Sequence, residues 1–218
     1  MDEPCIPAKP GTKSLIMKNW ISHPTQLAGE NIDLLPLEKD HYAELQALAA
    51  DKRIWEFYLY DASEPANFLN VFADALLERE KGSQYPFVIM QRSRQKIIGS
   101  TRFLDLQPLH RKLEIGATWL HPDYWATAVN AECKLLLLTY CFEKLGALRV
   151  QLKTDENNTR SRKAIEKIGG QFEGILRNDM VRSNGSSRNS AYYSLIYEEW
   201  PAKKSALEQL YENSCRLT

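Results

Sequence analysis

One stretch, residues 114–170, constrains the fold of this chain more than any other. In order it reads as a strand (113–120), a loop (121–125), a long helix (126–145), a second strand (149–154) and a short helix (159–168). This alternation is typical of a β-α-β-α unit, in which the two strands run parallel. Because parallel layers bind ligands beyond the carboxyl ends of their strands, we expect a ligand between the two helix starts.

The remaining elements surround this unit. Asn184-Gly185 lies between two β-rich runs and is a strong hairpin signal, and polar turns separate the strands of a meander. The other predicted helices are 41–50, 63–81 and 205–212, and the other predicted strands are 31–37 at the edge of the sheet, 86–91, 96–104, 171–182 and 188–200. The order β-α-α-β-β-β-α-β-α-β-β predicts one mixed α/β domain with helices on both faces of its sheet.

Composition excludes several classes of protein. With 218 residues, 44% of them hydrophobic, the chain can bury one substantial core, which we place in residues 19–218. Lys and Arg total 28, as do Asp and Glu, so no basic field favours a nucleic-acid partner. The longest apolar run, 135–138, is too short for a membrane span. Residues 1–18 lack the apolar segment of a signal peptide and are predicted to be a flexible tail.

The cysteines indicate a reducing compartment. Cys5, Cys133, Cys141 and Cys215 show no CxxC spacing, and two of them fall inside the predicted long helix. This pattern favours reduced thiols and a cytoplasmic location over a disulfide framework or a zinc site. No His, Asp or Glu cluster has the spacing of metal ligands, so no metal is expected.

The start of the long helix carries small side chains. Pro122 ends the preceding strand, and Ala126, Thr127 and Ala128 lead into a helix whose first amides lack intrahelical partners. Such amides and the helix dipole suit a phosphate or pyrophosphate. An ordinary helix start would show the same spacing, and neither GxxxxGK[ST] nor GxGxxG occurs in the chain. Spacing alone therefore leaves the ligand open.

Two motifs nevertheless resemble those of a known family. The first runs from Glu114-Ile-Gly-Ala-Thr-Trp-Leu through Trp125 to Asn130-Ala-Glu132, and the second comprises Asn158-Thr-Arg-Ser161 and Ile165-Glu-Lys-Ile-Gly169. They resemble motifs A and B of the GCN5-related N-acetyltransferases (GNAT), and are most similar to the RimJ/RimL-like branch. The similarity extends weakly from Trp20 to Pro201, so it covers nearly all of the chain except the tail. It implies a GNAT-like, mostly antiparallel mixed sheet.

The resemblance implies an acetyl-CoA-dependent N-acetyltransferase acting as a monomer or homodimer. It would move an acetyl group to a primary amine, either a protein N-terminus or a small-molecule amine, by direct transfer in a ternary complex. Acetyl-CoA, with CoA as product, would contact Trp119, Leu120, Trp125, Ala126, Thr127, Ala128, Val129, Asn130, Asn158 and Lys163. Two alternatives stay open: a catalytically weak acyl-CoA-binding or protein-interaction module of the same fold, and a nucleotide-dependent α/β enzyme.

One residue departs from the family pattern. Ala128 stands where the loop pattern Q/R-x-x-G-x-G/A has a nearly invariant glycine. The backbone N–H is retained, but an added methyl group would crowd a pyrophosphate that approaches the backbone closely. We interpret Ala128 as a tolerated variant.

Acetylation of an amine requires a base, donors for the carbonyl oxygen and a proton for the departing thiolate. Glu114 is the predicted base, because it lies on the strand that leads to the cofactor loop. The alternative is that Glu114 only pairs with Lys112 or Arg102. By resemblance, backbone amides near Trp119 and Leu120 are the oxyanion donors, and one extra residue in this strand fits a β-bulge.

Ser161 is the predicted proton donor for the thiolate. It shares a helix face with Ile165 and Ile168 and therefore points towards the sheet. A hydroxyl group there needs a partner, which by resemblance is the thioester sulfur; a backbone carbonyl one turn back is the alternative. Asn158 would contact the cofactor or serve only as the helix cap.

The acceptor pocket is predicted around an aromatic run at residues 53–61. Trp55 and Tyr58 are the predicted substrate-binding residues, and the hairpin tip at 182–188 would help to shape the pocket. The alternative is that Trp55 and Phe57 fill the core between two helices.

Overall fold

The computed structural model describes residues 19–216, so the predicted tail at 1–18 lies outside the described residues. Its centre is one eight-stranded sheet in the order β1-β2-β3-β4-β5-β6-β8-β7, in which only β5 and β6 are parallel neighbours. The strands are β1 (Leu27–Ala28), β2 (Ile32–Pro36), β3 (Tyr85–Gln91), β4 (Lys96–Gln107), β5 (Lys112–Leu120), β6 (Arg149–Asp155), β7 (Gln171–Val181) and β8 (Ser187–Ile196). The predicted mixed, mostly antiparallel sheet is therefore confirmed.

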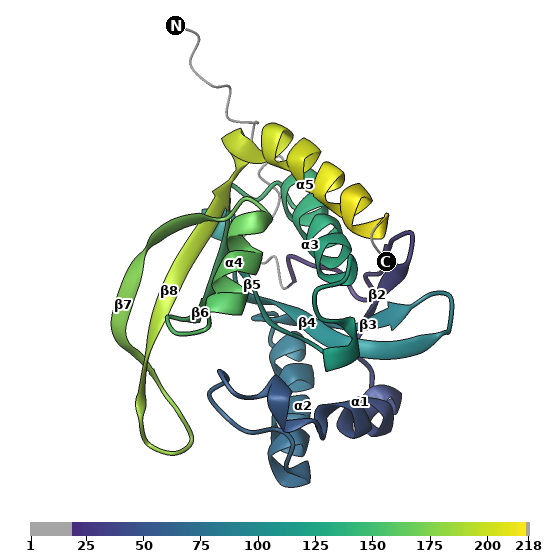
Figure 1. Ribbon diagram of the computed structural model, residues 1–218, viewed down its shortest axis with the longest axis vertical. Coiled ribbons are helices and arrows are strands. Elements are labelled where there is room, and N and C mark those ends of the chain that lie inside the picture. Colours follow the sequence, from purple (N-terminus) through teal and green to yellow (C-terminus); the bar gives the residue numbers. More distant parts are fainter. Residues whose placement is uncertain (1–18, 217–218) are drawn as a thin grey trace, which may run out of the picture.

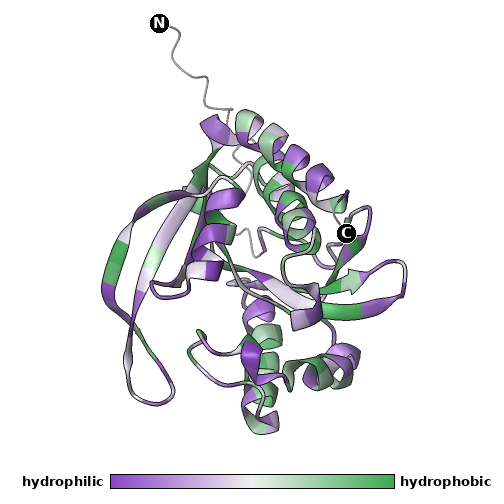
Figure 2. Cartoon of the chain, viewed as in Figure 1, coloured by the Kyte–Doolittle hydropathy of each residue, from purple (hydrophilic) through white to green (hydrophobic). Residues whose placement is uncertain are grey.

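Helices cover both faces of the sheet, as predicted (Figure 1). One face, here the α3 face, carries α3 (Val129–Thr139), α4 (Thr159–Lys167) and α5 (Trp200–Cys215). The other, the α2 face, carries α1 (Tyr42–Ala49) and α2 (Pro65–Glu80). Each face has its own hydrophobic core. Hydrophobic positions run through α3 and the central strands, whereas hydrophilic positions dominate α4 (Figure 2).

The helix predicted at 126–145 is shorter than expected. It begins at Val129, ends at Thr139 and continues as one π-helical turn, Tyr140–Lys144. Ala126 has a φ of +59°, a left-handed conformation that a right-handed helix does not accept. Residues 126–128 therefore form a turn before the helix, and the prediction of its start was wrong by three residues.

At both ends of the described chain the structure differs from the predicted elements. The short β1 pairs with β2, so the strand predicted at 31–37 is not at the edge of the sheet. At the other end, α5 begins at Trp200, well before the predicted residue 205. Pro201 does not end β8, which stops at Ile196, because it lies in the first turn of α5, where proline needs no hydrogen-bonded N–H.

A buried carboxylate fastens the β1–β2 connection to α3. Glu132 is only 3% exposed, and its Oε1 accepts hydrogen bonds from the N–H groups of Glu30 (2.6 Å), Asn31 (2.8 Å) and Ile32 (3.4 Å). Its Oε2 has no partner among residues 19–216. Glu132 thus acts as a structural side chain, although it lies within the first motif.

We expect Glu132→Ala to lower the free energy of unfolding by about 3 kcal/mol, because it leaves buried N–H groups without acceptors. Glu132→Gln should cost only about 1 kcal/mol, because its amide oxygen still accepts hydrogen bonds. Urea denaturation followed by circular dichroism measures both values. Equal losses for the two variants would show that the negative charge, and not the acceptor oxygen, stabilises this connection.

Candidate active site

The candidate site is the opening between β5 and β6. The two strands pair over three residues only, from Lys112 opposite Arg149 to Glu114 opposite Gln151. Beyond this point both strands continue separately, β5 to Leu120 and β6 to Asp155. Because they run parallel, the loops before α3 and α4 emerge at the same end of the opening (Figure 1). The structure therefore brings the two predicted helix starts together.

The turn before α3 presents free backbone amides. The Trp125 indole donates to the Leu120 carbonyl oxygen (2.9 Å), and the Thr127 hydroxyl donates to the Tyr124 carbonyl oxygen (2.8 Å), which fixes the turn. The first backbone bond of the helix joins the Glu132 N–H to the Ala128 oxygen (3.0 Å). No acceptor within residues 19–216 is recorded for the N–H groups of 128, 130 and 131. These donors are available to an anionic ligand.

Ala128 fits this turn without strain. Its φ of −64° and ψ of −18° are ordinary for any L-residue, so the conformation does not require glycine. The residue is only 8% exposed and belongs to the core of the α3 face. Its methyl group therefore packs inside the protein instead of covering the free amides.

The start of α4 presents a serine with a free hydroxyl group. The side chain of Asn158 accepts a hydrogen bond from the Ser161 N–H (2.9 Å), so Asn158 is the helix cap. Ser161 is half-buried, and no hydrogen bond of its Oγ is recorded with any residue from 19 to 216. The bond to a carbonyl one turn back is not present. The hydroxyl is thus available to a ligand in the opening.

Arg160 joins the two helix starts, a contact that the sequence reasoning missed. Its guanidinium carbon lies 3.7 Å from the centre of the Trp125 ring, a cation–π stack across the opening. The first turn of α4 thereby places a positive charge beside the free amides of α3. Lys163, the cation predicted to contact the cofactor, is exposed on the next turn.

The strand β5 contains the predicted bulge. Arg102 lies opposite Gly116 and Ser100 opposite Trp119, so β5 has one residue more than β4 over this interval. Ala117, inside the bulge, has a φ of +45°. The bulge lies where β5 has already separated from β6.

Beyond the bulge, the backbone of Leu120 faces the opening. The His121 N–H donates to the Ile98 oxygen (2.9 Å), so the alternating ladder turns the N–H and C=O groups of Leu120 away from β4. The bond from Trp125 to the Leu120 oxygen has the same direction. Of the two predicted oxyanion donors, Leu120 is the one whose amide has this direction. The Trp119 side chain is buried in the core of the α2 face.

Glu114 lies at the last paired position of β5, on the α2 face of the opening. It is 4% exposed, and its Oε2 accepts a hydrogen bond from Gln151 (2.9 Å) and forms an ion pair with Lys153 (3.3 Å). Burial is the largest single influence on the pKa of Lys153 and lowers it, but Glu114, Tyr192 and Asp179 together outweigh burial, so the net pKa is raised. The predicted alternative partners, Lys112 and Arg102, form no ion pair with Glu114.

A buried lysine supports the bulge from the α3 face. Lys134 is only 5% exposed, and its ammonium group donates to the Thr118 hydroxyl (2.6 Å), which is itself 2.7 Å from the Thr101 hydroxyl. Burial lowers the pKa of Lys134. From the sequence, Lys134 is only one more residue of the long helix. Its contact with β5 is visible only in the three-dimensional structure.

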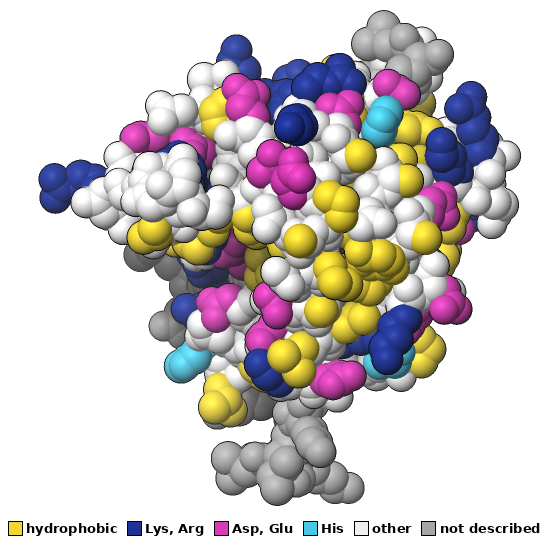
Figure 3. All heavy atoms as spheres, turned by 90° about the horizontal axis from the view of Figure 1, so that it is seen from below, with side chains coloured by type: hydrophobic (Ala, Val, Ile, Leu, Met, Phe, Trp, Pro, Cys, Tyr) yellow, Lys and Arg dark blue, Asp and Glu magenta, His cyan; other side chains and the backbone are white. Residues whose placement is uncertain are grey.

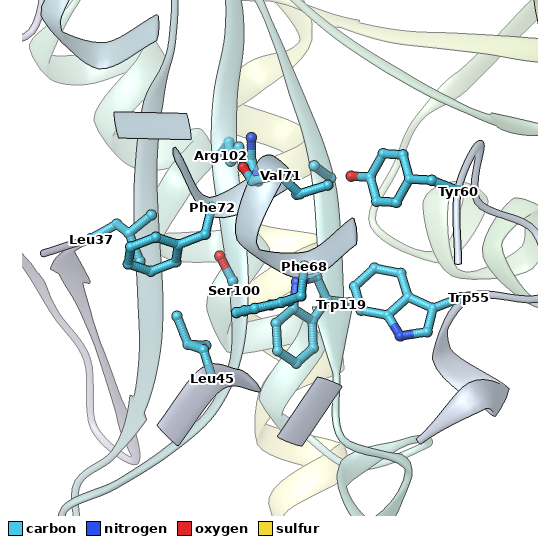
Figure 4. A pocket seen from close by; sticks show the side chains of 11 residues that line it. Leu37, Leu45, Trp55, Tyr60, Phe68, Val71, Phe72, Ser100, Arg102 and Trp119 are labelled. Carbon is cyan, nitrogen blue, oxygen red and sulfur yellow. The ribbon is translucent and has the colours of Figure 1, made fainter. Parts of the chain in front are cut away.

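The predicted acceptor residues lie on the α2 face. Trp55 is 4% exposed and packs in the core there, yet it also lines a small cavity (Figure 4). The Tyr58 hydroxyl donates to the Thr118 oxygen (2.7 Å), and burial raises the pKa of Tyr58 above its usual value. Trp55 therefore fills the core, and its contact with a substrate stays a prediction, whereas Phe57 belongs to neither core.

The β7–β8 hairpin reaches the same face. Its turn is closed by the Gly185 N–H on the Arg182 oxygen (2.8 Å), as the Asn-Gly signal predicts. The Ser183 N–H donates to the Leu59 oxygen (2.7 Å), so the hairpin tip touches the aromatic loop. Hydrophobic side chains gather at the middle of the α2 face, beside the projecting hairpin (Figure 3). The loop and the hairpin together border the acceptor side.

Comparisons with known proteins agree with this geometry. Residues 31–171 match the family model described as Acetyltransferase (GNAT) domain. The uncharacterised N-acetyltransferase YoaA of Bacillus subtilis is 29% identical over 130 residues, 60% of this chain and 71% of YoaA. YdaF of the same organism, named as a candidate ribosomal N-acetyltransferase, is 32% identical over 108 residues, 50% of this chain and 58% of YdaF.

Solved structures show the same fold. A GCN5-related N-acetyltransferase from Brucella melitensis has a TM-score of 0.78 at 26% identity, covering 86% of this chain and 85% of its own. Mycobacterium smegmatis RimJ, solved with CoA-disulfide, has a TM-score of 0.73 at 18% identity, covering 86% and 95%. The chain belongs to the GNAT acetyltransferase family, and its relatives support the resemblance to the RimJ/RimL-like branch.

Within residues 19–216, no helix combines the length and apolar character needed to cross a membrane. The same residues contain no group of three His, Cys, Asp or Glu side chains placed to hold a metal ion.

We expect Ala128→Gly to lower the free energy of unfolding by about 1 kcal/mol, because it removes a buried methyl group. The matched control is Ala126→Gly, which should stabilise the protein slightly, because glycine accepts the left-handed φ of residue 126. Chemical denaturation measures both changes. A stabilising Ala128→Gly would contradict the packing of this methyl group.

Proposed function

We propose that this protein transfers an acetyl group from acetyl-CoA directly to a primary amine in a ternary complex. One observation carries the proposal. The β5–β6 opening has free amides and a free Ser161 hydroxyl at its α3 face, and the Glu114 carboxylate at its α2 face. A thioester placed through the opening would therefore meet an amine coming from the other side.

The residues present fit an acyl-CoA. The free amides at the start of α3 and the Arg160 guanidinium would hold the pyrophosphate, and Asn158 and Lys163 border the other wall. The buried methyl group of Ala128 leaves these amides accessible, so this residue does not block the cofactor site. The thioester supplies an activated acetyl group, and the chain supplies position and proton transfer.

Each catalytic group has one task. Glu114 accepts the proton of the acceptor amine, directly or through a water molecule, while Lys153 and Gln151 fix its carboxylate. The Leu120 N–H donates to the carbonyl oxygen as negative charge develops on it. The Ser161 hydroxyl donates a proton to the departing thiolate. No covalent bond between the acetyl group and the protein is required.

The acceptor is a primary amine on a small molecule or a protein N-terminus. A ribosomal-protein acceptor is supported by the name of YdaF, whose match covers 50% of this chain. A cytoplasmic location remains a prediction from the cysteine pattern.

Ser161→Ala tests the proton donor. We expect turnover to fall by about 10- to 100-fold while the affinity for acetyl-CoA changes less than about threefold, because the hydroxyl acts mainly on the leaving group. Thiol release gives the turnover, and calorimetry gives the affinity. Ser205→Ala, on the distant helix α5, is the matched control. Loss of acetyl-CoA binding in a folded Ser161→Ala protein would contradict the assigned role.

A further inference from the structure

A small cavity on the α2 face lies beside the candidate active site. It encloses about 20 Å³ between the aromatic loop, α2, β4 and β5, enough space for about one small polar group. Its walls are mostly hydrophobic and include five aromatic side chains, and Arg102 from β4 is the cation among them (Figure 4). Its lining includes Trp55, Tyr60, Phe68, Phe72, Arg102 and Trp119.

Arg102 is a half-buried cation, and Asp74, the carboxylate whose charge raises its pKa, is not in contact with it. It forms no ion pair with any carboxylate of residues 19–216, and its Nε has no hydrogen-bond partner there. Its two remaining contacts, to the Gln84 side chain and the Val71 carbonyl oxygen, are both 3.4 Å long, beyond the usual range. Burial lowers the pKa of Arg102, because the charged form is poorly solvated. A guanidinium has five donor N–H groups, and most of these are unused.

Two further donors line the same cavity. The Tyr60 hydroxyl points towards Arg102 in Figure 4, and no acceptor for it is recorded within residues 19–216. The same holds for the Trp119 indole N–H, whereas the Trp55 indole donates to the Ala49 carbonyl oxygen (2.7 Å). The cavity therefore has an excess of donors over acceptors and no negative charge, which suits an anionic group.

The position of the cavity relates it to the chemistry. Arg102 lies directly across the ladder from Gly116, which is two residues along β5 from Glu114, on the same face. A methyl group at Gly116 would lie 3.0 Å from the Glu114 Oε1 and 2.7 Å from Leu104. The absence of a side chain at 116 thus lets the Leu104 side chain and the Glu114 carboxylate lie against the backbone of β5, next to the position of Arg102.

We propose that Arg102, with Tyr60 and Trp119, binds a carboxylate or similar anionic group carried by the amine acceptor. The inference rests on the proposed function and narrows its acceptor to amines that also bear a negative charge. The amine would lie at Glu114 while the anionic group lies at Arg102, on either side of Gly116. The carboxylate would come from a free amino acid or from an acidic side chain near a peptide N-terminus.

The test compares acetylation rates for amine pairs that differ only in charge. One arm uses free amino acids against their amides, and the other uses dipeptide amides that begin with aspartate against those that begin with asparagine. We expect kcat/KM to be about 10- to 100-fold higher for the charged member of at least one pair. Arg102→Met should remove this preference while leaving the rate for the neutral member within about threefold.

Arg94→Met is the matched control, since this exposed arginine lies in the β3–β4 turn and its loss should leave the preference unchanged. Gly116→Ala should also reduce the preference, because its added methyl group takes up space beside Glu114 although it changes no charge. Thermal unfolding of every variant confirms that the fold is retained. The arm that shows the preference identifies the source of the anion.

The outcomes separate the two claims. If the protein acetylates charged and neutral amines at equal rates, or if Arg102→Met keeps the preference, the anion site is wrong and the proposed function stands. If no amine is acetylated although acetyl-CoA binds, the proposed function fails together with this inference.

Discussion

The separation of β5 from β6 after three paired residues is the constraint on which the rest of the structure depends. A parallel pair normally satisfies its backbone groups along its whole length, so separated strands leave polar groups that need other partners. Here a bulge at Ala117 turns β5 away, and side chains use part of the exposed backbone: Tyr58 bonds the Thr118 oxygen and Trp125 bonds the Leu120 oxygen. The Leu120 N–H remains directed into the opening. The opening is therefore a regular part of this sheet, and backbone N–H donors lie at its edge.

Charge is distributed unequally around this opening. On one side, Arg160 stacks on Trp125 beside free helix amides, which favours a polyanionic cofactor. On the other side, Glu114 shares its Oε2 with Lys153 and Gln151. Neighbouring Arg102 forms no ion pair with a carboxylate of residues 19–216, and its Nε has no hydrogen-bond partner there. The acceptor side thus combines one negative and one unpaired positive group, an arrangement that suits an acceptor with both charges.

Local signals in the sequence predicted the elements that depend on local physics. Pro122, the Asn158 cap and the Asn184-Gly185 turn are read from adjacent residues, and all three lie where they were expected. The start of α3 was misplaced, because nothing in the identity of Ala126 signals its left-handed φ. The partners of Glu114 could not be predicted, because Gln151 is 37 residues away and meets it only through the register of a parallel pair. The contacts of Arg160 and Lys134 were missed for the same reason, and Arg102 was considered only as a partner of Glu114.

Calorimetric titration with acetyl-CoA tests the central claim most directly, with ATP as the phosphate comparator. The account requires that the β5–β6 opening and the start of α3 form a site for CoA compounds and not a general phosphate site. We expect saturable binding of acetyl-CoA and CoA in the micromolar range, and binding of ATP at least about tenfold weaker. Arg160→Ala should weaken the binding of both CoA compounds. Equal affinity for ATP and acetyl-CoA, or no heat and no thermal shift with acetyl-CoA, would contradict the account.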